Sequence, residues 1–309
     1  MFLLLALVLT VPAPSAGHSL VYAATQGGVL LVHGESAGPA RLWRWSGSSW
    51  EDRGELGTTP RSLAACAYDA EHHLLVVHGG ALPNKQANGS TDWKVDGQTL
   101  AWDGKTWRVL AEGGPTRRDH HAMVYDSARK KLVLYGGGDA DPTGRADYFG
   151  DTWEWDGKVW TQVATAGPGP RVHHAMAYDA LRGRTVMTGG YGPKGPDGKT
   201  WEWDGKAWED KGSSDVAFRT SPRLAFDGSR KKVVLFGGEN RSGMPADTYE
   251  WDGTRWTRIA EQGPPGRTVH ALAYDEARKA LVLFGGAGPD PLADTWEFRE
   301  GVWKRADSR

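Results

Sequence analysis

The chain has 309 residues, of which 39% are apolar, and a formal net charge of −1. A charge so close to zero gives no electrostatic reason to expect nucleic acid or an anionic membrane surface as a partner. With one cysteine, the sequence excludes an internal disulfide, a CxxC redox pair and a cysteine-based zinc site. Cys66 lies in an apolar segment where other parts of the chain carry Met123 or Met176, so we expect a small core residue there.

The N-terminal residues 1–13 allow two interpretations. Residues 2–11 form an apolar run too short to span a bilayer, and the small residues that follow fit a secretory cleavage site. No lysine or arginine precedes the run, so a buried first strand is the alternative. We therefore expect a secreted or periplasmic protein with no membrane span, and a cytoplasmic protein as the alternative.

One pattern of about 50 residues then recurs six times along the chain. A typical copy has an alternating strand at 121–125, an apolar strand at 132–135 with two glycines after it, and an alternating strand at 152–155. An Asp-Gly hairpin leads to a fourth strand that contains Trp160. In all six copies the third-strand aromatic residue precedes the fourth-strand tryptophan by five positions. The copies are placed at 14–55, 56–113, 114–166, 167–212, 213–262 and 263–309.

The paired glycines, the third-strand aromatic residue and the closing tryptophan resemble the kelch repeat, over essentially all of residues 14–309. The chain looks like a bacterial-type exported kelch protein. The resemblance implies an all-β fold, a six-bladed kelch β-propeller with four antiparallel strands in each blade. Propellers of this kind carry many unrelated activities, so function has to be argued from a site.

Because the four strands of a blade run alternately up and down, two repeated residue types are expected on one face of the propeller. The segment before the first strand and the loop between the second and third strands leave a four-stranded meander on the same side. An arginine stands just before the first strand in five copies, and a histidine follows three residues later in four. Near the channel mouth, such guanidinium groups could bind a carboxylate or phosphate, and histidine could titrate. The alternative is a structural role between blades. The candidate residues are Arg61, Arg118, Arg171, Arg219, Arg267, His121, His174 and His270.

Departures from the repeat are better indicators of function, because the needs of the scaffold do not explain them. The third copy adds Asp119 and His120, and the fourth adds His173. The fifth copy has Pro222 in place of the histidine, followed by Arg223.

The loops between the second and third strands are long in the second and third copies. They carry Trp93, Tyr148 and Phe149, and Tyr191 lies in the adjoining fourth copy. Aromatic side chains above a channel mouth are typical of sugar or peptide binding, and the alternative is that they pin the loops. The aspartates of the third-copy loop match no EF-hand spacing, so we expect no metal and no cofactor.

The opposite face repeats an Asp-x-x-Arg turn in four copies, which we interpret as local turn closure on a solvated rim. A basic docking ring is the alternative.

We expect a monomeric, non-catalytic binding module that presents its loop-rich face to a glycan, a cell-wall component or a protein partner. A first alternative is an exported sugar mutarotase or epimerase acting on an acidic sugar, because the chain resembles the six-bladed N-acetylneuraminate epimerases. In that case Arg118, Arg171 and Arg267 would bind the carboxylate, and His121 or His174 would move protons. A second alternative is a cytoplasmic protein-interaction scaffold.

Overall fold

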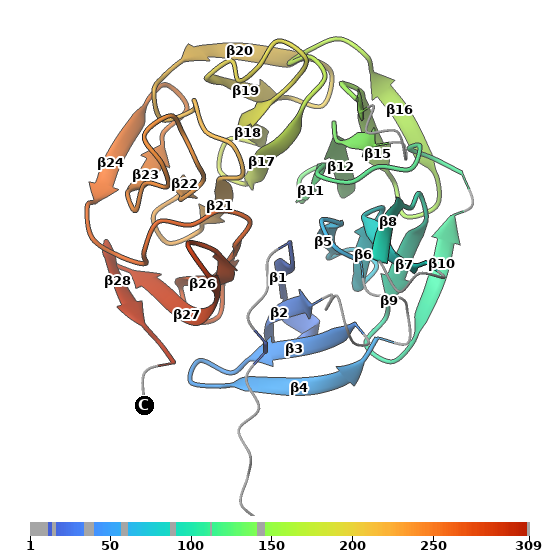
Figure 1. The fold of residues 1–309 in the computed structure, drawn as a ribbon, viewed down its shortest axis with the longest axis horizontal. Coiled ribbons are helices and arrows are strands. Elements are labelled where there is room, and N and C mark those ends of the chain that lie inside the picture. The colour runs from blue at the N-terminus through green and yellow to red at the C-terminus, as the bar shows by residue number, and fades with distance from the viewer. Residues whose placement is uncertain are drawn as a thin grey trace, which may run out of the picture.

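The computed structural model describes residues 12–13, 17–33, 40–56, 61–86, 91–111, 113–140 and 146–307. Over these residues the chain forms a ring of six blades around a central channel (Figure 1), which confirms the predicted all-β propeller with four antiparallel strands per blade. Most of the N-terminal segment predicted as a signal peptide or first strand, residues 1–11, lies outside the described residues. Among the described residues, no helix is long and apolar enough to cross a membrane.

Each blade consists of the strands of one repeat, in sequence order from the channel to the rim. Blade 1 contains β1 (Ser19–Ala23), β2 (Gly28–His33), β3 (Arg41–Trp45) and β4 (Trp50–Glu55). Blade 2 contains β5 (Ala65–Asp69), β6 (Leu74–His78), β9 (Thr99–Trp102) and β10 (Trp107–Ala111). Blade 3 contains β11 (Ala122–Asp126), β12 (Lys131–Tyr135), β15 (Thr152–Trp155) and β16 (Trp160–Ala164).

The second half of the ring repeats this arrangement. Blade 4 contains β17 (Val172–Asp179), β18 (Arg184–Tyr191), β19 (Lys199–Trp203) and β20 (Trp208–Ser213). Blade 5 contains β21 (Arg223–Asp227), β22 (Lys232–Phe236), β23 (Thr248–Trp251) and β24 (Trp256–Ala260). Blade 6 contains β25 (Ala271–Asp275), β26 (Ala280–Ala287), β27 (Pro291–Arg299) and β28 (Val302–Arg305).

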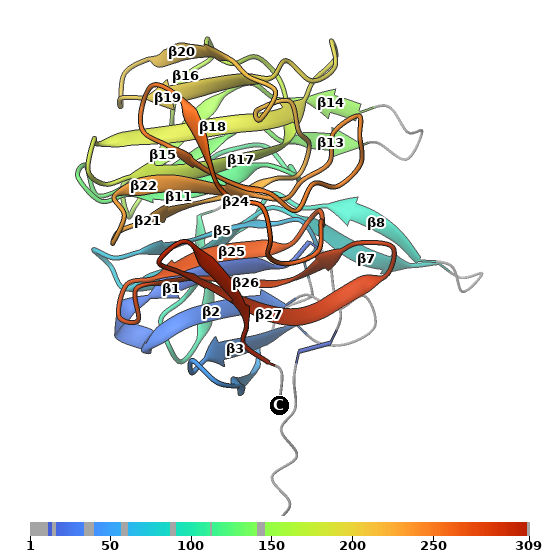
Figure 2. The same cartoon turned by 90° about the vertical axis from the view of Figure 1, so that its left-hand side faces the viewer.

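The two long loops form additional hairpins on one face. They are β7 (Ala81–Lys85) with β8 (Thr91–Val95) in blade 2, and β13 (Gly138–Ala140) with β14 (Ala146–Tyr148) in blade 3. Both hairpins project from the same side of the ring (Figure 2). This is the face to which strand parity assigns the repeated arginines.

The constant aromatic spacing is the register of the outer hairpin. Trp155 lies directly opposite Trp160, and their rings are 5.6 Å apart. The turn between them needs a positive φ at Gly157. The Asp156 carboxylate accepts hydrogen bonds from the backbone NH groups of Lys158 and Val159. A hairpin of fixed length keeps both aromatic rings in the interface with the preceding blade.

The paired glycines make room for the next blade. A side chain on Gly136, where φ is +64°, would place its Cβ 2.8 Å from the Arg171 carbonyl oxygen and 2.9 Å from the His174 ring. The NH of Gly137 donates to that same carbonyl at 2.9 Å. In this way the second glycine of one blade holds the backbone of the repeated arginine in the next blade. The other donor–acceptor pairs are Gly80 with Arg118, Gly190 with Arg219 and Gly238 with Arg267.

The ring closes between blades 6 and 1 by the contacts that join the other blades. Between blades 3 and 4, for example, the Trp208 indole NH donates to the Thr152 hydroxyl at 2.9 Å. At the closure, Trp50 donates to Thr295 at 2.8 Å, and the His18 Nε2 is hydrogen-bonded with the carbonyl of Phe284 at 3.0 Å. In the part of the chain that the structure describes, both closing blades keep four strands of their own and exchange none. The sequence had not determined this mode of closure.

Candidate functional site

The five predicted arginines form ion pairs inside their own blades. Arg118 is fully buried, and its guanidinium binds Asp151 at 2.8 and 3.0 Å and donates to the Gly136 carbonyl at 2.9 Å. Burial raises the pKa of Asp151, but its hydrogen bonds with Arg118 outweigh burial and hold the pKa below its usual range. The other pairs are Arg61 with Asp96, Arg171 with Asp197, Arg219 with Asp247 and Arg267 with Asp294.

These side-chain contacts are structural and lie within one blade, whereas the alternative to ligand binding that the sequence offered was a role between blades. Each guanidinium ties the segment before the first strand to the segment that leads into the third strand of the same blade. None of the five is among the described residues that line the central cavity. Their charge is neutralised within the blade, so they add little positive potential at the channel mouth.

The three predicted histidines are buried in the seams between blades, and we call His121, His174 and His270 the seam histidines. Each ring lies edge-on against the residue before the paired glycines of the preceding blade, as His174 does against Tyr135 at 5.6 Å. Burial lowers the pKa of His174 to about 3 and holds the pKa of His121 and His270 well below the usual value. They are therefore neutral at physiological pH and serve the packing of neighbouring blades.

Different residues face the channel mouth, because the chain turns sharply two residues after each arginine. There, one residue of every blade adopts a left-handed conformation, with φ between +45° and +79°. Five of these residues donate their NH to the carbonyl of the equivalent residue in the preceding blade, at 2.8 to 3.2 Å. This left-handed ring encircles the cavity and consists of Gly17, Leu63, His120, His173, Ser221 and Val269.

Polar and aromatic side chains gather on one side of this ring. The His120 and His173 rings are 4.0 Å apart, and His173 Nδ1 is hydrogen-bonded with the Ser221 hydroxyl at 2.8 Å. Tyr191 stacks on His173 with an interplanar angle of 16°, and Tyr148 lies edge-on against Tyr191. We call these five residues the mouth cluster. It joins the β13–β14 hairpin to the channel rim.

His173 is neutral at physiological pH. Its pKa is lowered to about 3, mainly by burial and then by the neighbouring His120 and Arg223. His120 is hydrogen-bonded to Asp119 at 2.8 Å. Across the described residues, no group of three or more histidines, cysteines and acidic residues is placed to hold a metal ion.

The predicted loop aromatics divide between two environments. Tyr148 and Tyr191 belong to the mouth cluster. Phe149 covers the Arg118 guanidinium at 4.4 Å and so belongs to the scaffold, whereas Trp93 on β8 is 48% exposed. The site residues predicted from the sequence did not include His120, His173 and Ser221. His120 and His173 had been noted only as departures from the repeat.

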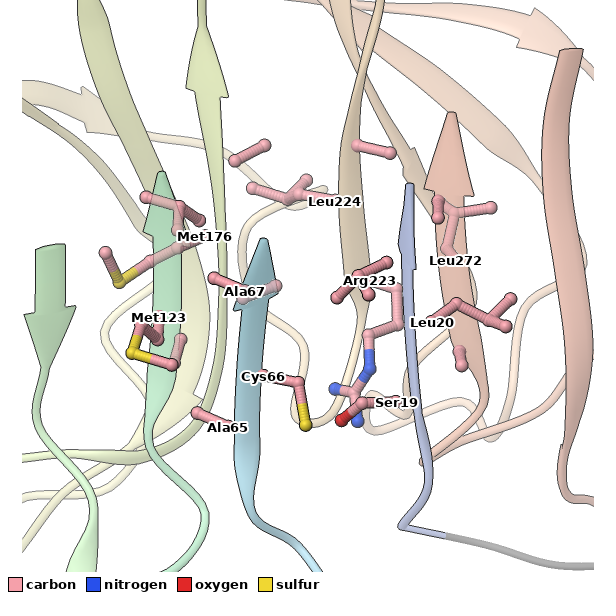
Figure 3. Close-up of a pocket in the computed structure, with 18 of the residues that line it drawn as sticks. Ser19, Leu20, Ala65, Cys66, Ala67, Met123, Met176, Arg223, Leu224 and Leu272 are labelled. Carbon is pink, nitrogen blue, oxygen red and sulfur yellow. The ribbon is translucent and has the colours of Figure 1, made fainter. Parts of the chain in front are cut away.

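A cavity of about 470 Å³ lies beneath the mouth, between the six innermost strands. Figure 3 shows Ser19, Cys66 and Arg223 on its wall, with the Arg223 side chain extending into the cavity. Cys66 was expected in the core. It packs against a core cluster but also faces this cavity, and burial raises the pKa of its thiol to about 12.

The Asp-x-x-Arg turns of the opposite face close locally, as expected. The Asp126 carboxylate accepts hydrogen bonds from the NH groups of Ala128 and Arg129 and from the Arg129 side chain. The Arg129 guanidinium also binds Glu154, which in turn accepts from the Trp203 indole of the next blade. The arginines of this face are engaged in turns and seams.

No family model matches the chain, and no match was found among curated proteins. Among solved structures, that of YjhT is similar to this chain, with a TM-score of 0.71 and 14% sequence identity over 96% of this chain and 98% of that one. A likeness at this level of identity concerns the fold alone. It supports the propeller architecture and assigns neither a ligand nor a reaction.

Proposed function

We propose that the protein is a non-catalytic binding module, a propeller of kelch-type repeats whose mouth cluster binds a glycan on the loop-rich face. The observation that carries this proposal is the unbroken row of ring contacts from His120 through His173 and Tyr191 to Tyr148. All four rings are partly exposed, and the row lies beside the entrance of a cavity. Sugar rings bind to such surfaces through their apolar faces and satisfy their hydroxyl groups at the polar edges.

Electrostatics favours binding over proton transfer at this site. A general base works best when its pKa lies near the operating pH, and the pKa of His173 is lowered to about 3. The seam histidines, which an acidic-sugar mutarotase would need as acid or base, are neutral and buried. The arginines assigned to its substrate carboxylate are paired with aspartates. A binding role requires none of these groups to titrate.

The proposal is tested by measuring glycan affinity of the wild type and a Tyr191→Ala variant by calorimetry, after an array has selected a glycan ligand. Removal of one stacking ring should weaken binding about tenfold, since aromatic contacts of this kind contribute about 1 kcal/mol. The matched control is Trp93→Ala, which removes an exposed ring on the same face outside the mouth cluster. Equal melting temperatures would establish that both variants fold.

Two outcomes would contradict the proposal. One is a Tyr191→Ala variant that keeps wild-type affinity, and the other is loss of binding in Trp93→Ala instead, which would move the site to the β7–β8 hairpin. If no glycan of the array binds the wild type, the proposed glycan specificity is wrong.

We also propose that the protein is exported, on the apolar run and small residues at its N-terminus. Sequencing the N-terminus of the protein purified from its native source tests this. A mature chain that begins just after residue 13 supports export, and a chain that retains residues 2–11 contradicts it.

A further inference from the structure

Arg223 occupies a position that small residues fill in every other blade. It is the first residue of β21 and lies four positions after Arg219, directly after Pro222. The residues at the equivalent position, four before the aspartate or alanine that ends each innermost strand, are Ser19, Ala65, Ala122, Ala175 and Ala271. An arginine among four alanines and a serine has no counterpart in the scaffold, so packing of the blades does not account for it.

The Arg223 guanidinium has no acidic partner among the residues that the structure describes. Its one hydrogen bond is donated by Nη1 to the neighbouring Pro222 carbonyl at 3.1 Å. The described residues that line the cavity include no aspartate, no glutamate and no other arginine or lysine. Burial, opposed by no nearby carboxylate, lowers the pKa of Arg223 to about 10, so the side chain remains a cation at neutral pH.

The histidines that face Arg223 do not neutralise it. Burial is the main cause of the lowered pKa of His173, His174 and His270, and the positive charge of Arg223 is a further cause in each. All three are therefore neutral beside it, and Cys66 stays protonated because burial raises the pKa of its thiol to about 12. The cavity thus carries one uncompensated positive charge at neutral pH.

The surrounding wall is mainly apolar. Leu20, Leu224 and Leu272 line the cavity around Arg223, and the alanines of the equivalent positions complete it (Figure 3). A cation surrounded by low-dielectric walls attracts an anion more strongly than an exposed arginine does. The Ser19 hydroxyl on the cavity wall donates to the Ala64 carbonyl at 3.3 Å, so Arg223 is the donor on which the site depends.

We propose that Arg223 is the anchor of a binding site for a small monocarboxylate inside the central cavity. The planar guanidinium would hold the carboxylate through paired hydrogen bonds, and the apolar body of the ligand would lie against the leucine and alanine wall. A cavity of about 470 Å³ has room for such a molecule. This site lies beneath the mouth cluster and does not depend on glycan binding there.

The test uses sodium butyrate as the anion and butyramide as its neutral analogue, with sodium chloride at equal concentration as a second comparison. Melting temperature is measured for the full chain at pH 7 and low ionic strength. We expect butyrate to raise the melting temperature of the wild type by a few degrees at concentrations far above its dissociation constant, and butyramide to leave it unchanged.

The matched variant is Arg223→Ala, which restores the residue that four other blades carry at this position. We expect it to fold with a melting temperature equal to or above that of the wild type, because an unpaired buried cation is removed, and to lose the response to butyrate. Arg255→Ala removes the same charge from a side chain that is 80% exposed, and should respond as the wild type does.

Three results would overturn the proposal: a response to butyrate that survives in Arg223→Ala, an equal response to chloride, which would indicate a simple counter-ion, or no response in the wild type. Saturation-transfer NMR on the butyrate methyl group provides a second measurement in each variant, and the absence of transfer in the wild type would also overturn it. Because glycan affinity is measured with Tyr191→Ala, failure of one proposal leaves the other standing.

Discussion

Acidification should destabilise this propeller through histidines buried in its seams. The pKa of His78 and of His174 is lowered to about 3, and the pKa of His121 and His270 lies well below the usual value. The folded protein therefore keeps these four rings neutral, while the unfolded chain takes up protons near pH 6.5. Because the unfolded state binds more protons, stability is complete above pH 6.5 and falls as the pH decreases toward the folded-state pKa values.

The magnitude follows from the size of the pKa shifts. One pH unit below the unfolded-state pKa costs about 1.4 kcal/mol for each histidine that stays neutral in the fold, so each loses about 2 kcal/mol by pH 5. His173 adds a fifth group, because its pKa is also lowered to about 3. The five groups together remove about 10 kcal/mol, which is comparable to the whole stability of a typical domain. We expect the free energy of unfolding to fall by about 6 kcal/mol per pH unit between pH 6 and pH 5.

Urea unfolding followed by tryptophan fluorescence at pH 7.5, 6.0, 5.5 and 5.0 measures this slope. His121→Ala is the matched variant, because blade 2 carries Ala64 at the equivalent position. Removal of one of five groups should reduce the slope by about a fifth. A flat profile down to pH 5, or a nitrogen NMR titration that shows His174 protonating near pH 6 in the folded protein, would refute the reasoning.

Two further changes test the scaffold. Thr200→Val removes the hydroxyl that accepts the Trp256 indole NH at 2.9 Å in a site where Thr200 is 1% exposed, and should lower the free energy of unfolding by about 1–3 kcal/mol in urea titrations. An unchanged midpoint would mean that this seam contact contributes nothing. Arg267→Ala removes a fully buried guanidinium and leaves the partly buried Asp294 without its partner. It should cost about 3 kcal/mol, read as a lower melting temperature, with glycan affinity retained below that temperature. Lost affinity at full stability would restore the ligand-binding role first considered for these arginines.

The blade could be predicted from the sequence because its determinants are local. The five-residue spacing from Trp155 to Trp160 spans one hairpin, and the Asp-Gly turn between them requires the positive φ that glycine supplies. The paired glycines, such as Gly136 and Gly137, follow directly from the close approach of the next blade. Six copies of such a unit bury their faces only against one another, so the ring was predictable once the copies were counted.

The candidate site was less predictable, because it depends on contacts between distant segments. Arg118 is held by Asp151 from the far end of a long loop, and the sequence contains no pattern that fixes this pairing. His174 is buried only because the preceding blade covers it. Repetition of a residue along the chain therefore does not distinguish a side chain that holds the blades together from one that faces a ligand.

The sequence by itself determined the strands, the hairpins, the number of blades and the face on which the long loops emerge. Tertiary structure alone decided which side chains reach the channel. A single left-handed residue in each blade turns His120 and His173 toward the mouth while their neighbours enter the seams. Ring closure then brings the six innermost strands around one cavity, where Arg223 meets no carboxylate among the described residues. Side-chain direction and charge compensation arise only when all six blades are assembled.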